Sequence, residues 1–285
     1  MRRIMLLILA LATLLPSLAQ AYDVLVLQSR RDPYYDEVVK GFRTERNTSV
    51  RLLVLSDYSE VDVVRIVRED KPRMILAVGD SALKAARKVQ STPVLAVMTL
   101  GIPDFKSNQS NLSGISMFVS PERYIGVFRN MKTRRVGVVH NPAKSGWYMN
   151  QARQIARQSD IELVVREIST SRETLDKLSG LAGKVDALWM LPDTIAVTRE
   201  TTEAYFRFGQ QYSVPVISFS GTYIGLGAAV ALEIDRYALG RQADGLAVAI
   251  LSGQRSERQV IFPAKTELKK NNSVLQRLRV EPGRN

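Results

Sequence analysis

The chain has 285 residues, enough for one large or two medium domains, and 45% of them are hydrophobic. It has no cysteine, which excludes disulfides, thiol catalysis and a lipid-modified N-terminal cysteine, and its one histidine, His140, argues against a metal site. The net charge is +12, but the basic residues are spread thinly and match no nucleic-acid-binding motif. We therefore expect a solvated basic surface and no nucleic-acid partner.

Residues 1–21 have the features of an export signal. Arg2 and Arg3 precede a short apolar run at 4–15, and Ala19-Gln20-Ala21 supplies a small-residue cleavage site. A membrane anchor is the alternative, but the run is too short to span a bilayer. We expect a mature chain that begins near Tyr22 and is periplasmic, without a lipid anchor.

The first part of the mature chain alternates apolar runs with amphipathic stretches. The apolar runs predict strands at 24–27, 50–55, 74–78, 94–97 and 114–118. The amphipathic stretches predict helices at 33–43, 60–69 and 81–89. Near-continuous Val, Ile and Leu runs joined by helices are typical of a parallel sheet covered on both faces.

The same pattern then occurs a second time. Strands are predicted at 136–140, 163–167, 187–191, 214–218 and 229–234. Helices are predicted at 147–159, 172–181, 198–212 and 237–251. After these come a short strand at 259–262, a polar segment and a small helix at 273–278.

These patterns predict an α/β protein of two Rossmann-like lobes with parallel sheets. We assign residues 22–118 and 235–257 to the first lobe, and residues 119–234 and 258–285 to the second. The chain then crosses between lobes near Ser120, Asp235 and Ser256, and three crossings make a hinge. Because ligands bind beyond the carboxyl ends of parallel strands, two facing lobes predict a closing cleft.

Several short motifs are spread over nearly the whole mature chain. They are Asn111-Leu112-Ser113-Gly114-Ile115-Ser116, Arg135-Val136-Gly137-Val138-Val139-His140-Asn141-Pro142, Val185-Asp186-Ala187-Leu188-Trp189-Met190-Leu191-Pro192-Asp193, Val214-Pro215-Val216-Ile217 and Gly240-Arg241-Gln242-Ala243. With them the chain resembles the periplasmic substrate-binding proteins of ABC transporters, in the branch with tryptophan- and other aromatic-amino-acid-binding members. The resemblance implies a type I periplasmic binding protein with a small-molecule ligand, an inner-membrane ABC permease as partner, no cofactor and no catalysis.

Candidate ligand contacts in the first lobe follow two strands. Gly79-Asp80-Ser81-Ala82 opens a helix, where free N–H groups suit a carboxylate, although Asp80 is also a candidate N-cap. Ser29 and Tyr34 follow the first strand, and Tyr34 is placed to stack on a ligand.

Candidate contacts in the second lobe also lie at strand ends. Asp193 is predicted to hold a ligand ammonium group, with a helix-capping role as the alternative. The others supply hydrogen bonds or aromatic cover: Asn141, Ser145, Trp147, Ser218, Phe219 and Ser220.

We therefore predict an exported, monomeric solute-binding protein of an ABC importer that captures a small ligand, such as a zwitterionic amino acid. A periplasmic sensor subunit needs the same cleft and remains an alternative. An exported hydrolase is disfavoured, because the chain has one histidine and Leu83 replaces the second glycine of a nucleophile elbow. No metal-ligand spacing is present.

Overall fold

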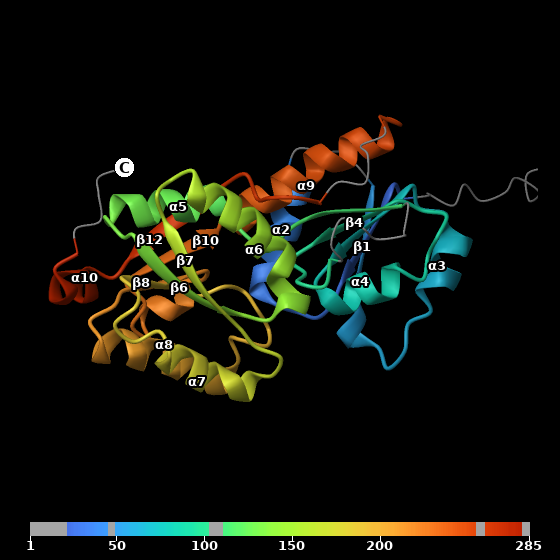
Figure 1. Ribbon diagram of the computed structural model, residues 1–285. Coiled ribbons are helices and arrows are strands. Elements are labelled where there is room, and N and C mark those ends of the chain that lie inside the picture. The colour runs from blue at the N-terminus through green and yellow to red at the C-terminus, as the bar shows by residue number, and fades with distance from the viewer. Residues whose placement is uncertain (1–21, 45–48, 103–110, 255–259, 281–285) are drawn as a thin grey trace, which may run out of the picture.

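The protein, seen here in a computed structural model, consists of two α/β lobes joined by several chain segments (Figure 1). The structure describes residues 22–44, 49–102, 111–254 and 260–280. The predicted export signal at 1–21 and the predicted crossing near Ser256 lie outside the described residues. None of the described helices is both long enough and apolar enough to cross a bilayer.

The first lobe is built on a six-stranded sheet with the order β11-β5-β4-β3-β1-β2, in which every pairing is parallel. Its strands are β1 (Val24–Gln28), β2 (Val50–Val54), β3 (Met74–Val78), β4 (Val94–Val97), β5 (Leu112–Ile115) and β11 (Val260–Ile261). Every residue of β1, β3 and β4 is buried, as the continuous apolar runs predict.

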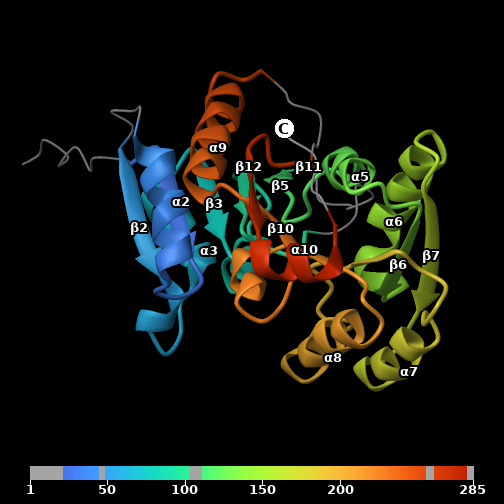
Figure 2. The same cartoon turned by 90° about the vertical axis from the view of Figure 1, so that its left-hand side faces the viewer.

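Helices cover both faces of this sheet. They are α2 (Pro33–Arg43), α3 (Val63–Asp70), α4 (Asp80–Ala86) and α9 (Arg236–Leu251). Val24 and Val26 pack in one core cluster with residues of α2 and α9, while Leu25 and Leu27 pack in another with residues of α3 and α4. The alternation along β1 thus sets which helices lie on each face (Figure 2).

The second sheet has the order β12-β10-β9-β8-β6-β7, and only its β12 edge is antiparallel among the described pairings. Its strands are β6 (Arg135–His140), β7 (Glu162–Glu167), β8 (Ala187–Trp189), β9 (Val216–Ser218), β10 (Val230–Ile234) and β12 (Thr266–Lys270). Its helices are α5 (Pro121–Asn130), α6 (Pro142–Arg157), α7 (Thr174–Ser179), α8 (Arg199–Gln211) and α10 (Asn272–Leu278). Short 3₁₀ turns lie at η1 (Leu55–Asp57), η2 (Ser171–Glu173) and η3 (Gly221–Ile224).

The chain passes between the sheets three times. It leaves the first sheet after β5, returns after β10 through α9, and leaves again between β11 and β12. The assignment of all of 258–285 to the second lobe is wrong for Val260–Ile261, because this strand pairs with β5 of the first sheet. The third crossing therefore lies at 262–265.

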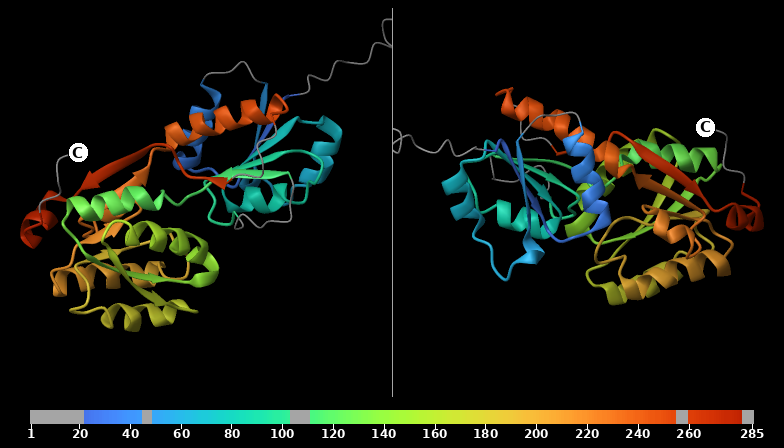
Figure 3. Two further views of the ribbon diagram at one scale, coloured as in Figure 1. Left: turned by 45° about the horizontal axis from the view of Figure 1, so that its top comes forward. Right: turned by 180° about the vertical axis from the view of Figure 1, so that it is seen from behind.

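Two glycines allow α9 to dock on the first lobe although α9 follows a strand of the second. A Cβ on Gly41 of α2 would lie 2.1 Å from the Tyr237 carbonyl oxygen, and a Cβ on Gly240 of α9 would lie 2.1 Å from the Val38 carbonyl oxygen. The two backbones are therefore in direct contact, and both views of Figure 3 show the helices side by side. This contact attaches α9 to the first lobe.

We expect Gly240→Ala to destabilise the protein by about 1–3 kcal/mol or more, because the added methyl group meets backbone that has no room to move. Gly245→Ala is the matched control on the same helix, since nothing lies within 4 Å of its added Cβ. The control should be neutral or stabilising by about 0.5–1 kcal/mol. Urea unfolding of both variants measures the difference, and equal stabilities would contradict close helix contact.

Candidate functional site

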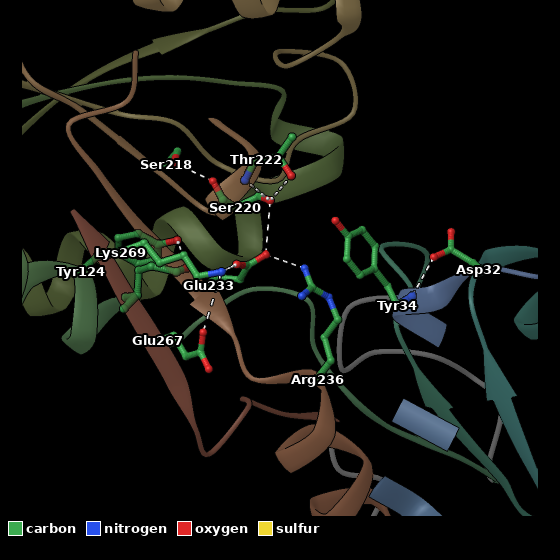
Figure 4. Close-up of polar contacts among 11 residues, drawn as sticks. Asp32, Tyr34, Tyr124, Ser218, Ser220, Thr222, Glu233, Arg236, Glu267 and Lys269 are labelled. Carbon is green, nitrogen blue, oxygen red and sulfur yellow. Dashed lines mark hydrogen bonds and ion pairs between the residues drawn. The ribbon is translucent and has the colours of Figure 1, made fainter. Parts of the chain in front are cut away.

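A polar cluster lies where the two lobes meet, and Figure 4 draws it. Its centre is Glu233 on β10, which is 5% exposed. Its Oε1 accepts a hydrogen bond from the Arg236 guanidinium (2.5 Å), and its Oε2 accepts one from the Lys269 ammonium (2.5 Å). The Ser220 hydroxyl also donates to Oε1, at 3.5 Å. One buried carboxylate thus holds two cations from different elements.

The charge of Glu233 is maintained by these two cations. Burial raises the pKa of the Glu233 carboxyl, whereas hydrogen bonds from Lys269 and Arg236 lower it, and the balance falls below the ordinary value. Glu233 is therefore ionised at neutral pH despite its burial.

Tyr34 reaches this cluster from the first lobe. The Arg236 guanidinium lies over the Tyr34 ring, 3.9 Å from its centroid. Tyr34 is half exposed, and its hydroxyl points toward the turn that carries Ser220 and Thr222 (Figure 4). Tyr34 and Ser220, two of the predicted contacts, thus lie in one polar cluster formed by both lobes.

The predicted anion site at 79–82 is largely filled by the protein itself. The Ala82 N–H donates to the Ser29 hydroxyl (2.9 Å), so Ser29 caps α4. Gly79 has φ 91°, and a Cβ there would lie 2.6 Å from Ser29 Oγ and 2.7 Å from the Tyr35 hydroxyl. Ser29, Gly79 and Ala82 are therefore brought together, but as a packed turn.

Asp80 and Ser81 have different surroundings in the same turn. The Asp80 carboxylate accepts hydrogen bonds from the Thr99 hydroxyl and from the Gly101 N–H (2.8 Å), which holds the loop after β4. Asp80 also borders a surface pocket of about 410 Å³ beside α4. The Ser81 side chain is exposed and makes no hydrogen bond with the described residues. Within this turn, Ser81 and the second carboxylate oxygen of Asp80 are thus the side-chain groups not used by these hydrogen bonds.

Asp193 has the capping role, and the predicted contact with a ligand amine is not supported. Its side chain is buried, and all four acceptor positions of its carboxylate are used. Oδ1 accepts from the N–H groups of Ile195 (2.9 Å) and Ala196 (3.0 Å). Oδ2 accepts from the Asn141 N–H (2.8 Å) and the Ser145 hydroxyl (2.6 Å). Asp193 ties three loops of the second lobe together and has no position left for an ammonium group.

Asn141 and Ser145 likewise serve the second lobe. The Asn141 side chain accepts from the Ala143 N–H (3.0 Å) as the N-cap of α6, and it donates to the Ile168 carbonyl (2.9 Å). Ser145 is fully buried, and its hydroxyl lies 3.1 Å from His140 Nδ1. Because the Ser145 proton is directed at Asp193, this Ser-His-Asp group is a buried structural network.

Trp147 lies at the crossings between the lobes. Its ring is stacked on Phe262 with centroids 6.2 Å apart, and it meets Phe118 edge to face at 5.3 Å. Phe262 belongs to the third crossing and Phe118 to the first. The neighbouring Tyr148 hydroxyl donates to the Val119 carbonyl (2.8 Å). Trp147 thus packs against the connecting segments.

In the turn after β9, some side chains pack in the core and others lie in the cluster around Glu233. Ser218 is buried and donates to the carbonyls of Ser220 (3.2 Å) and Val230 (3.4 Å), and Phe219 packs edge to face on Tyr223. Of the three predicted contacts in this turn, only Ser220 has a side chain that reaches the cluster, where its hydroxyl lies 3.3 Å from that of Thr222.

Four residues of the cluster are not among the predicted contacts, namely Thr222, Glu233, Arg236 and Lys269. One signal was available for two of them. Glu233 is a charged residue inside an otherwise apolar strand, and Arg236 follows three residues later at the start of a helix. Buried charges are normally paired, so a glutamate inside an apolar strand predicts a nearby cation. Among the described residues, no three metal-binding side chains gather.

We expect Asp193→Asn to destabilise the fold by about 1–3 kcal/mol, because the amide nitrogen cannot accept the hydrogen bonds that the carboxylate accepts. Asp57→Asn is the control, since its partner Arg31 is exposed and such surface pairs contribute little. Chemical denaturation gives both values, and an Asp193→Asn variant as stable as the control would contradict the capping role.

The single histidine predicts a pH dependence of stability. Burial lowers the pKa of the His140 imidazole from 6.5, although Asp193 and Glu167 oppose this shift and Arg153 adds to it. The native state therefore binds fewer protons than the unfolded chain, so this contribution is full above about pH 6.5 and is lost as the pH falls through the folded pKa. His140→Gln should flatten the pH dependence of the free energy of unfolding between pH 7.5 and 5.5. An unchanged slope would show that other groups cause it.

The chain is similar to known proteins both in sequence and in fold. The chain is 24% identical over 196 residues to a tyrosine-binding protein from Clostridioides difficile, and the match covers 65% of this chain and 56% of that relative. It is structurally similar to the ligand-free, open structure of a substrate-binding protein with adhesive properties from Clostridium difficile (TM-score 0.70, 20% identity, 93% of this chain and 97% of that chain). It also resembles an ABC domain in complex with L-Trp from Streptococcus pneumonia (TM-score 0.60, 16% identity, 91% and 96%).

These structural similarities identify a type I periplasmic binding protein fold, in agreement with the predicted two-lobed architecture. The family model described as ABC transporter substrate binding protein matches residues 53–281, which is most of the chain. The chain therefore belongs to the ABC transporter substrate-binding protein family.

Proposed function

We propose that this protein is an exported solute-binding protein that captures an amino acid between its lobes and delivers it to an ABC permease in the inner membrane. The observation that carries the proposal is the meeting of Tyr34, from the first lobe, with Arg236 and the cluster around Glu233. A ligand held there touches both lobes, so its binding energy favours the closed arrangement over the open one.

The three crossings support a hinge. Glu233 lies on β10 of the second lobe, and Arg236 lies on α9, which docks on the first lobe through Gly41 and Gly240. Rotation between the lobes therefore occurs within the short segment that joins these two residues. The third crossing runs beside it, since the Asp235 N–H donates to the Lys265 carbonyl (3.3 Å).

An amino acid is the ligand class that the relatives favour, since one is a tyrosine-binding protein and another was solved with L-Trp. The residues of the site agree with an amino acid, because the site combines charged side chains with the hydroxyls of Ser220 and Thr222. The features of residues 1–21 support export, and the absence of cysteine from the whole sequence supports a periplasmic protein without a lipid anchor.

A thermal-shift screen of the mature protein against amino acids, sugars, nucleosides and organic acids tests the proposal. We expect an amino acid to stabilise the protein, by about 2.7 kcal/mol at a concentration of 100 times its dissociation constant. Small-angle scattering with the same ligand should show a smaller radius of gyration.

Two results would contradict the proposal. Stabilisation by sugars or nucleosides alone would refute the ligand class, and saturation without compaction would refute a closing cleft. Turnover of a bound compound would favour an enzyme instead. A Tyr58→Phe variant is a control for the screen: because this exposed tyrosine lies outside the site, the variant should respond to the ligand as the wild-type protein does.

A further inference from the structure

We propose that Arg236 is the receptor for the ligand's carboxylate, and that Glu233 and Tyr34 hold its guanidinium in position. This inference rests on the proposed function, because it names the contact that selects the ligand. It places the anion site at the start of α9 and not at the predicted turn at 79–82.

Arg236 has hydrogen-bond donors that no described residue uses. The Arg236 side chain is 18% exposed, and among the described residues only Glu233 accepts hydrogen bonds from it, through Nη2. A guanidinium has five N–H donors in a fixed plane, so Nε and Nη1 have no acceptor there. A mostly buried cation with unused donors is suited to a planar, doubly accepting carboxylate.

The charge of Arg236 is only partly balanced. Glu233 is the buried carboxylate between Arg236 and Lys269, so among the described residues Arg236 shares its one ion-pair partner with a second cation. Lys269 has a further carboxylate at 3.8 Å, that of Glu267, and both of these side chains are about half exposed. Asp235 is paired with Lys265 instead, at 2.9 Å. Of the two cations, Arg236 is therefore the mostly buried one with only a shared counter-charge, which an anionic group would balance.

The Arg236 guanidinium is held from two sides. Glu233 bonds one edge of the group, and the Tyr34 ring lies against its face at 3.9 Å. In Figure 4 the plane of Arg236 is confined between these two residues, and the hydroxyl groups of Ser220 and Thr222 lie across the gap. A contact that is fixed before the ligand arrives costs less entropy on binding.

The test compares three amino acids with their carboxamides, which keep the amine and the side chain but lack the carboxylate charge. The probes are L-tyrosine, L-tryptophan and L-leucine, each with its amide, and titration calorimetry measures their dissociation constants. For any amino acid that binds, the wild-type protein should prefer the acid over the amide by about 10- to 100-fold. In Arg236→Gln this preference should fall to about 1.

Two further variants separate recognition from folding. Arg236→Lys keeps a cation and an aliphatic stem but loses the planar fork, so its preference for the acid should fall about tenfold even if the Gln variant does not fold. Arg65→Gln removes an exposed arginine in the first lobe and should leave the preference unchanged.

The outcomes distinguish this inference from the proposed function. If the wild-type protein binds acid and amide equally, or if Arg236→Lys keeps the full preference, Arg236 does not receive the carboxylate, although the protein still captures amino acids. An equal loss of affinity for acid and amide in Arg236→Gln would indicate a structural role and also overturn the inference. If none of the six probes binds, both the amino-acid assignment and the inference fail. The thermal-shift screen then shows whether the protein captures another solute.

Discussion

The backbone contact between α2 and α9 at Gly41 and Gly240 is the constraint on which the site depends. It holds α9 on the first lobe directly after β10 has completed its pairing in the second sheet. Glu233 and Arg236 are therefore only three residues apart in sequence, yet they belong to different lobes. This is why a single local ion pair lies between the two bodies and beside Tyr34, which the same α2 carries. No loop rearrangement is needed to bring residues of both lobes together.

Most of the fold follows from local patterns in the sequence. The strands β3 and β4 are apolar throughout and β1 is apolar up to Gln28, which predicts strands buried on both faces. Asp32 and Thr198 precede helices that their side chains cap. The pattern could not place Val260–Ile261, because a two-residue strand has no periodicity of its own and its lobe is decided by pairing with β5. It also missed β12, whose Lys and Glu residues read as a polar loop; its exposed edge position explains that composition.

The site was harder to predict than the fold. The predicted contacts follow strand ends, but the sequence does not show whether a polar side chain there binds a ligand or stabilises the protein. Asp193 is an example, since four donors from its own lobe occupy its carboxylate. Ser29 is another, because its hydroxyl is used by Ala82. Tyr34 and Ser220 are predicted contacts that lie in the cluster around Glu233, whereas the place of Arg236 in that cluster depends on which lobe α9 joins.

The packing of Trp147 has a spectroscopic consequence. The sequence contains two tryptophans, and both lie in the aromatic core that connects the lobes. Trp147 contacts Phe118 and Phe262 on two different crossings, whereas Trp189 is fully buried beside Tyr124 and Phe128. Bending at the crossings, as the proposed hinge requires, would act directly on the surroundings of Trp147, whereas among the described ring contacts Trp189 meets those segments only through Tyr148. The intrinsic fluorescence of the protein would then report the proposed movement of the lobes without an attached dye.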